Sequence, residues 1–218
     1  LLAAAKAADV EVTLGHCIAN VLGTLGVQGA RLEDLSNGRM RELSCDVIGV
    51  SGGWSPTIHL ASHRGTKPVW SPQESAFLAG DPSPGAHWAL AGAVQGRMSL
   101  AQTLKAGAKA GAQAARDQGY KARAVIHKVE GFTEDDHEEA RAFWAVPKAY
   151  TRAKAFVDFQ HDVTTKDVTQ AAHEGFLSPE HMKRYTTLGM AMDQGKLSNT
   201  LGQALLAQAQ DKPMEAVG

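Results

Sequence analysis

The stretch KAFVDFQHDVTTKDVTQAAHEGFLSPEHMKRYTTLGMAMDQGKLSN, residues 154–199, decides the fold of the C-terminal part of the chain. Its residue types are those that begin and end short helices. Thr164 is followed three residues later by Asp167, a spacing typical of a capping box at a helix N-terminus. Gly175 can adopt the left-handed conformation that ends a helix. The pattern therefore predicts a short helix between Thr164 and Gly175.

A second helix is predicted directly after the first. Ser178 can cap it, Pro179 fits its first turn, and Gly189 marks its expected end. A loop over residues 190–199 separates this helix from a third, rich in Ala and Leu, expected from about Thr200 to Gln210. Residues 153–212 are therefore predicted to form a small all-α domain.

This segment resembles the small helical domain related to bacterioferritin-associated ferredoxin, in which Cys-x-Cys and Cys-x4-Cys pairs hold a [2Fe–2S] cluster. Asp158, Gln160, Asp193 and Ser198 occupy the four corresponding positions. Iron–sulfur clusters require thiolate ligands, with imidazole as the known substitute. We therefore expect a helical domain of this type without a [2Fe–2S] cluster and without a metal site.

The amino-acid sequence of the segment also resembles one family, the α subunit of heterotetrameric sarcosine oxidase. The resemblance lies in AFVDFQ, DVT, EGF, KRYTTLGMA, DQGK and SN. The chain departs from it at His161, Met192 and Leu197, none of which is one of the four ligand positions. The resemblance implies a flavoprotein complex that oxidises sarcosine to glycine, passes electrons from FAD to FMN to O2, and transfers a one-carbon unit to tetrahydrofolate.

Composition sets broad limits on function. The chain has 218 residues, a net charge of −1 and 44% hydrophobic residues, typical of a globular protein. This charge gives no basic footprint for nucleic acid. Cys17 and Cys45 are too few for a disulfide framework, and no apolar run is long enough to span a membrane. We therefore expect a cytoplasmic protein, and the helix-like start LLAAAKAA suggests an internal piece of a larger polypeptide.

Residues 9–50 carry the pattern of β-strands. Strands are expected at VEVTLG and in the residues around the Asn37-Gly38 hairpin turn. The apolar run CDVIGV, residues 45–50, is expected to be central in a sheet. It is followed by Gly52 and Gly53, whose lack of side chains lets backbone approach a ligand, although a simple tight turn is an equal alternative.

Two Ala-Gly motifs follow in residues 1–125, which we predict to be the C-terminal part of an FAD/NAD(P)-binding, disulfide-reductase-like domain of the α/β class. The first motif is Ala79-Gly80-Asp81. The second is Ala91-Gly92-Ala93 with Gly96, expected to follow a strand and to precede a helix. A helix N-terminus directs unpaired N–H groups at an anion. The resemblance implies that this region binds NAD, through Gly92, Ala93, Met98 and Leu100, with Gly52 and Gly53 as further candidates.

Residues 126–152 are acidic and are predicted to be a linker, docked by Trp144 and Pro147. Two other clusters raise the question of a metal. The consecutive ligands of Asp135-Asp136-His137-Glu138 cannot all point inward, so a charged surface is expected there. His59 and His63 share a four-residue spacing, but the flanking prolines favour a solvated loop.

The helical domain also carries a concentration of hydrogen-bond donors. By resemblance, FMN lies where the α and β subunits meet, and we expect these donors to face it. They are Lys183, Arg184, Thr186, Thr187, Gln194 and Lys196.

No catalytic residue is expected in this chain, because the resemblance places sarcosine oxidation in the β subunit. The implied partners are the β, γ and δ subunits, with tetrahydrofolate held by a domain downstream. Two alternatives remain open: a scaffold whose nucleotide fold is vestigial, and a subunit of a related amine or opine dehydrogenase.

Overall fold

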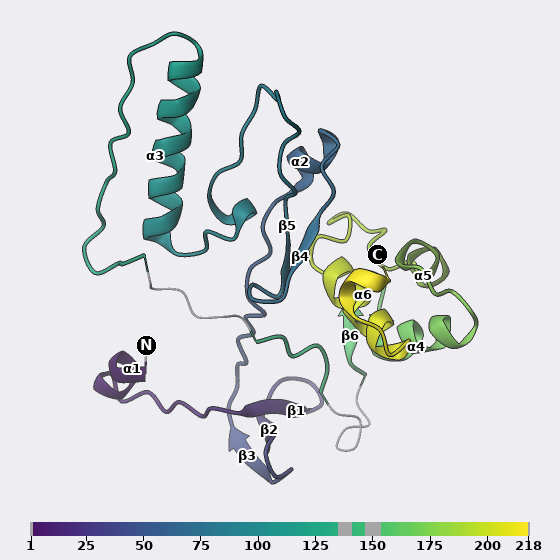
Figure 1. The fold of residues 1–218 in the computed structure, drawn as a ribbon. Helices are drawn as coiled ribbons and strands as arrows, with labels where there is room; N and C mark the ends of the chain where they lie inside the picture. The colour runs from purple at the N-terminus through teal and green to yellow at the C-terminus, as the bar shows by residue number, and fades with distance from the viewer. Residues whose placement is uncertain (1, 135–140, 147–153, 218) are drawn as a thin grey trace. The chain divides into compact units, whose positions relative to one another are not determined.

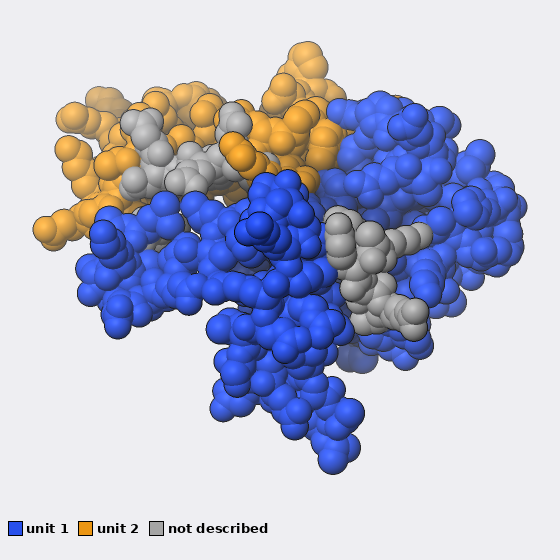
Figure 2. All heavy atoms as spheres, turned by 90° about the horizontal axis from the view of Figure 1, so that it is seen from below, with its two compact units in different colours: residues 1–51, 143–218 blue, residues 52–142 orange. Residues whose placement is uncertain are grey.

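The computed structural model describes residues 2–134, 141–146 and 154–217 (Figure 1). It divides into two compact units. One unit comprises Leu1–Ser51 with Phe143–Gly218, and the other comprises Gly52–Ala142 (Figure 2). Pro147 and the Asp135 to Glu138 cluster lie outside the described residues.

The first unit begins with helix α1, Leu2–Ala7, and a three-stranded antiparallel sheet. Strand β1 is His16–Leu22, β2 is Gly29–Asp34 and β3 is Met40–Ser44, in the order β1-β2-β3. The predicted hairpin at Asn37-Gly38 is confirmed: Gly38 has a φ of 71° and its N–H donates to the Asp34 carbonyl at 2.8 Å. The Asp34 side chain accepts from Ser36 and Asn37, which fixes the turn.

Two predicted strands do not form. Residues 10–15 are not a strand, since β1 begins only at His16, and residues 45–50 run on from β3 without regular structure. Val47 and Val50 are 77% and 87% exposed, so this run is not the centre of a sheet. An apolar run becomes a central strand only where neighbouring strands offer free backbone groups, and no strand among the described residues pairs with it.

The helical domain starts with a short ladder between β6, Phe156–Asp158, and β7, Val163–Thr164. Helix α4, Thr165–His173, begins with the predicted capping box: the Asp167 side chain accepts from the Thr164 N–H at 2.7 Å. Helix α5, Pro179–Thr186, begins with the predicted cap, where Ser178 Oγ accepts from the His181 N–H. Helix α6, Asn199–Ala209, and the 3-10 helix η3, Met214–Ala216, complete the domain.

Helix α5 ends earlier than the sequence predicts. It stops at Thr186, and Thr187 takes the left-handed conformation with a φ of 63°. Gly189 is also left-handed, with a φ of 72°, but its N–H is used by Asp158. The left-handed Thr187 therefore ends the helix, and Gly189, two residues later, makes a tertiary contact instead.

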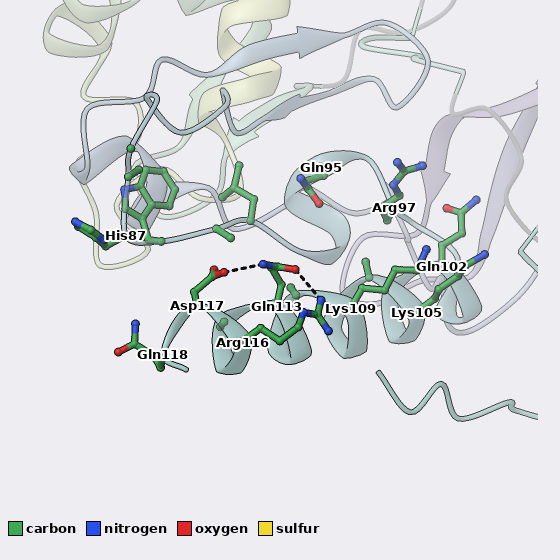
Figure 3. Close-up of a pocket in the computed structure, with 18 of the residues that line it drawn as sticks. His87, Gln95, Arg97, Gln102, Lys105, Lys109, Gln113, Arg116, Asp117 and Gln118 are labelled. Carbon is green, nitrogen blue, oxygen red and sulfur yellow. Dashed lines mark hydrogen bonds between the residues drawn. The ribbon is translucent and has the colours of Figure 1, made fainter. Parts of the chain in front are cut away.

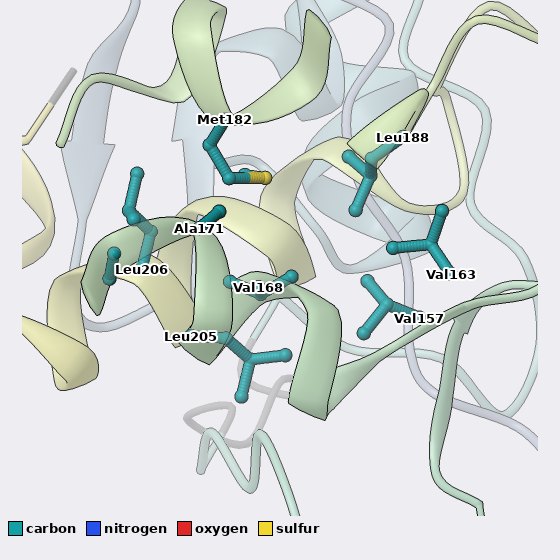
Figure 4. Close-up of a cluster of buried hydrophobic side chains, with 9 residues drawn as sticks. Val157, Val163, Val168, Ala171, Met182, Leu188, Leu205 and Leu206 are labelled. Carbon is teal, nitrogen blue, oxygen red and sulfur yellow. The ribbon is translucent and has the colours of Figure 1, made fainter. Parts of the chain in front are cut away.

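The core of the helical domain lies where α4, α5 and α6 meet (Figure 4). Val168, Leu188 and Leu206 are each 0% exposed, and burial of such side chains contributes about 1.5–3 kcal/mol each. Gly202 on α6 allows this packing, because a Cβ there would lie 2.9 Å from Leu188 Cδ1. Trp144 and Ala145 pack against the same core. Trp144 was predicted to dock the linker, and this contact agrees with that prediction.

The second unit contains helix α2, His59–His63, the hairpin of β4, Val69–Ser71, and β5, Ala76–Leu78, and the 3-10 helix η1, Gly92–Gln95. Helix α3, Leu100–Asp117, follows and is capped by Ser99, whose side chain accepts from the Gln102 N–H. The strand expected just before Gly92 does not form. Residues 89–91 have no regular structure. The loop expected around His59 and His63 is instead this short helix, and both imidazoles are exposed.

Candidate functional site

The turn that leads into α3 brings the two Ala-Gly motifs together. The Ala79 N–H, directly after β5, donates to the Val94 carbonyl of η1 at 2.9 Å. Gly92 and Gly96 have φ values of 79° and 76°, where a side chain is strained. A Cβ on Gly92 would also lie 3.2 Å from Thr103 Cγ2 of α3. Glycine at these positions is therefore required for the turn to sit against the helix.

Four of the residues predicted to bind NAD lie on this turn or at the start of α3. Gly92 is buried, Ala93 and Met98 are half-buried, and Leu100 is 42% exposed. Gly52 and Gly53 lie in an exposed segment, where a Cβ would meet no atom within 4 Å. No described contact joins these two glycines to the turn, so a close backbone approach at Gly52 and Gly53 is not seen within the described part of the chain.

A cavity of about 1210 Å³ lies along one face of α3 (Figure 3). Gln102, Lys105 and Lys109 project from the helix toward it, while Gln95 and Arg97 line it from the turn. The loop that carries His87 and Trp88 lines it as well.

The basic lining was missed at the sequence level, although a signal was present. Polar residues recur at three- and four-residue steps along α3, which places them on one helical face. They are Gln102, Lys105, Lys109, Gln113 and Arg116. A polar stripe on a helix otherwise made of small residues indicates a face that contacts solvent or a polar ligand.

Glu134 lies at the start of this basic face. Its Oε1 pairs with Lys105 Nζ at 2.5 Å, and its carbonyl accepts from Gln102 Nε2 at 2.8 Å and from Ser99 Oγ at 3.3 Å. The Lys105 hydrogen bond, helped by the charges of Lys109 and Arg97, holds the pKa of Glu134 below its usual value. The carboxylate is therefore ionised at neutral pH in a field of three cations.

The loop of the helical domain is organised by a buried aspartate. Asp158 is 4% exposed, and its two oxygens accept from the N–H groups of Gln160 at 2.8 Å and Gly189 at 3.0 Å. Burial alone would raise the pKa of Asp158. The N–H groups of Gly189, Gln160 and His161 outweigh burial and hold this pKa below its ordinary value.

The other loop positions form a connected cluster beside Asp158. Asp193 accepts from the N–H groups of Gly195 at 3.2 Å and Leu197 at 3.3 Å. The Asn199 side chain fills the space next to Gly189 and Gly195, since a Cβ on either glycine would overlap it. Ser198 is 1% exposed, and its Oγ has no hydrogen-bond partner among the described residues.

The side chains at the four cluster-ligand positions do not fit an iron–sulfur cluster. The oxygens of Asp158 and Asp193 are engaged by backbone N–H groups, and neither they nor Gln160 and Ser198 supply a thiolate or an imidazole. Within residues 2–134, 141–146 and 154–217, no three His, Cys, Asp or Glu side chains group as metal ligands.

The six residues predicted to face FMN differ in whether their side chains already have ionic or hydrogen-bond partners. Lys183 and Arg184 both pair with Glu180, at 3.3 and 3.7 Å. Thr186 Oγ1 donates to the Met182 carbonyl and accepts from the Leu188 N–H, so it serves the helix end. Thr187, Gln194 and Lys196 are exposed.

Among the helices of the described residues, none combines the length and the apolar character that a membrane span requires.

Comparison with known proteins gives the chain a family context. Residues 152–218 match the family model described as the sarcosine oxidase A3 domain. The chain is 40% identical to sarcosine oxidase subunit alpha from Rhizobium meliloti (strain 1021) over 200 residues, which cover 91% of this chain and 20% of that protein. It is 36% identical over 216 residues to the subunit alpha from Corynebacterium sp. (strain P-1), covering 94% of this chain and 22% of that protein.

The fold is also similar to that of a solved structure. The crystal structure of L-proline dehydrogenase from P. horikoshii aligns with a TM-score of 0.66 at 20% identity, over 91% of this chain and 40% of that one. This likeness confirms the predicted α/β fold class. The chain spans about one fifth of the length of its two relatives, and over most of its own length it is a homologue of sarcosine oxidase alpha subunits, with residues 152–218 matching the A3 domain of that family.

Proposed function

We propose that residues 52–134 contribute a dinucleotide-binding surface, with NAD as the ligand, to a flavin-dependent oxidoreductase of the sarcosine oxidase type. The observation that carries the proposal is the cavity along α3, toward which Gln102, Lys105 and Lys109 project. Cofactors commonly bind in concave surfaces where several polar groups converge. A surface made only for packing would show apolar side chains on that face instead.

In this proposal, the residues of the turn hold the ligand through backbone and apolar contacts. Gly92 and Ala93 bring main chain close to it, while Met98 and Leu100 offer apolar surface beside the helix start. No carboxylate occupies position 93, so a sugar hydroxyl there meets backbone and not an acidic side chain. Lys105 and Lys109 supply positive charge for phosphate. A bound nicotinamide dinucleotide would supply a hydride-accepting ring.

The activity of the whole protein belongs to the proposal too, because the chain spans about one fifth of its relatives. Their names support a subunit of a sarcosine oxidase, acting with further subunits. We propose that the complete complex, in the cytoplasm, uses FAD and FMN to demethylate sarcosine with O2 and tetrahydrofolate. This chain holds none of the catalytic residues in that scheme.

The nucleotide content of the native complex tests the proposal. The complex is purified without added nucleotide and denatured with acid, and the released cofactors are separated and identified by mass spectrometry. We expect NAD in a ratio near one per alpha subunit. Flavin without NAD, together with no NAD uptake on addition, would instead support the scaffold alternative.

A second proposal concerns the loop of the helical domain, which we propose faces FMN. It is supported by two exposed donors, Gln194 and Lys196, on a loop that Asp158 and Asp193 hold in place; the Thr187 hydroxyl already donates to the Thr186 carbonyl at 2.6 Å. Lys183 and Arg184 lie on the preceding helix and can exchange Glu180 for a phosphate, whereas Thr186 supports the helix end.

Replacement of Lys196 tests this second proposal. In the assembled complex, Lys196→Ala is expected to weaken FMN retention or to slow electron transfer between the flavins. Lys166→Ala, an exposed lysine on α4, is the matched control and is expected to change neither. Equal behaviour of the two variants would remove Lys196 from the FMN site.

A further inference from the structure

The loop that follows α5 carries two exposed methionines. Met190 is 50% exposed and Met192 is 96% exposed. Two successive turns hold the backbone around them: in the first, the Met190 N–H donates to the Thr187 carbonyl at 3.2 Å. In the second, the Gln194 N–H donates to the Ala191 carbonyl at 2.9 Å. The thioether of Met192 therefore lies open to solvent on a loop whose backbone is held in place.

The other methionines of the chain differ from Met192 in how far an oxidant can reach the sulfur. Met182 and Met214 are 1% and 8% exposed, and Met182 lies in the core of the helical domain (Figure 4). Met40, on β3, is 37% exposed, and Met98 is half-buried. Oxidation of a methionine by a dissolved oxidant depends on access to the sulfur. Met192 is therefore expected to react first among the six methionines of the chain.

The chemistry of an oxidase supplies such an oxidant. The relatives of this chain are named as subunits of a sarcosine oxidase. When an amine passes two electrons and two protons to O2 through a flavin, the product is hydrogen peroxide. A thioether sulfur takes one oxygen atom from peroxide: an S–O bond forms, the O–O bond breaks, and the second oxygen leaves as water with both protons. The sulfur loses two electrons and the peroxide gains them, so no further reactant is needed.

We propose that Met192 is a modification site of the complex, oxidised to the sulfoxide by the hydrogen peroxide that the complex itself produces. This inference rests on the proposed oxidase function and on the proposed position of FMN beside this loop, because peroxide formed there reaches Met192 before it enters bulk solution. Met192 is also one of the three positions at which the segment departs from the family that it resembles, so the resemblance assigns it no role. Oxidation converts an apolar side chain into a polar one and therefore weakens the apolar contacts of the loop as turnovers accumulate.

Peptide mass spectrometry of the full-length protein in its native complex tests the modification. The complex turns over sarcosine and O2 in the presence of catalase, which removes peroxide from bulk solution, and a matched sample is incubated without sarcosine. We expect turnover to raise the sulfoxide content of Met192 about tenfold over the matched sample, and to leave the buried Met182 unchanged. Met40 controls for location, and catalase is expected to protect it while Met192 is still oxidised.

The outcomes separate this inference from the function on which it rests. Peroxide production is measured in a parallel sample without catalase. Peroxide production without oxidation of Met192 would overturn the modification site and keep the oxidase function. Oxidation of Met192 that catalase abolishes would keep the modification site and overturn the source of peroxide beside the loop. An absence of sarcosine-dependent peroxide would overturn both the oxidase function and the modification.

A leucine variant tests the consequence for the loop. Met192→Leu keeps the volume and the apolar character of the side chain and removes the sulfur. We expect its activity to survive sustained turnover about twofold longer than that of the wild type, while the control Met40→Leu behaves like the wild type. Treatment with the two methionine sulfoxide reductases, one for each epimer, is expected to restore the wild type. Equal loss of activity in all three proteins would overturn the weakening of the loop by oxidation.

Discussion

The carboxylate of Asp158 accepts a hydrogen bond from the backbone N–H of Gly189 at 3.0 Å, which joins two segments of the helical domain separated by 31 residues. The same carboxylate accepts from Gln160, so one buried charge organises both loops. In the related ferredoxin-type domains that the sequence resembles, a metal cluster would connect these segments. Here an aspartate and backbone amides make the connection.

Replacing Asp158 with Asn tests this role. Asp158→Asn removes a charged acceptor from buried N–H groups, and we expect it to lower the free energy of unfolding of the helical domain by about 1–3 kcal/mol. Asp162→Asn is the matched control, because Asp162 is exposed and asparagine tolerates its left-handed backbone. Hydrogen exchange of α4 to α6 in increasing denaturant measures both changes, and equal stability of the two variants would contradict the role.

The pH dependence of stability follows from the same contact. The pKa of Asp158 is lowered in the folded state, so its contribution is fully present above its unfolded pKa of about 3.9. That contribution is lost as pH falls through the lowered pKa. The pKa of Asp167 is lowered by the Thr164 hydroxyl and N–H, and it acts in the same direction. Wild-type helical-domain stability should therefore fall as pH drops below about 4, and Asp158→Asn should show a shallower decline. Parallel pH profiles would contradict the assignment.

Two helical glycines should respond to alanine with opposite signs. Gly202→Ala on α6 places a Cβ 2.9 Å from Cδ1 of the fully buried Leu188, and we expect a loss of about 1–3 kcal/mol. Gly111→Ala on α3 meets open space, so helix propensity alone should stabilise α3 by about 0.5–1 kcal/mol. Hydrogen exchange of each helix gives the two values, and a stabilising Gly202→Ala would show that the core has room.

Two serines of the helical domain should differ as well. Ser198 Oγ is buried without a described partner, so Ser198→Ala removes a desolvated hydroxyl and should be neutral or stabilising by up to about 1 kcal/mol. Ser178→Ala removes the cap of α5 and should cost about 1 kcal/mol. Denaturant unfolding of both variants decides this, and a clear loss for Ser198→Ala would mean that its hydroxyl is bonded in solution.

The sequence was informative where local chemistry determines structure. The Thr164 and Asp167 capping box, the Ser178 cap and the Asn37-Gly38 hairpin depend on residues within a few positions of each other. Each of them forms as predicted. Capping and turn signals are strong because a single side chain satisfies a specific backbone group.

The sequence was misleading where structure depends on distant partners. The apolar run at residues 45–50 has strand composition, yet no described strand pairs with it, and the glycine expected to end α5 instead receives a contact from Asp158, 31 positions earlier. The pairing of Glu134 with a cation of α3 depends on distant partners in the same way. Only the folded chain brings Glu134 to Lys105, which lies 29 positions earlier in the sequence.

The affinity of the native complex for NAD, with and without the lysines of α3, tests the central claim most directly. Calorimetry on the wild type, on the double variant Lys105→Ala and Lys109→Ala, and on the control Lys121→Ala would give three dissociation constants. Lys121 is an exposed lysine outside the cavity lining. We predict that the double variant binds NAD about ten- to a hundredfold more weakly than the wild type, while the control is unchanged. Equal affinity in all three proteins would contradict the assignment of the α3 cavity as the nucleotide site.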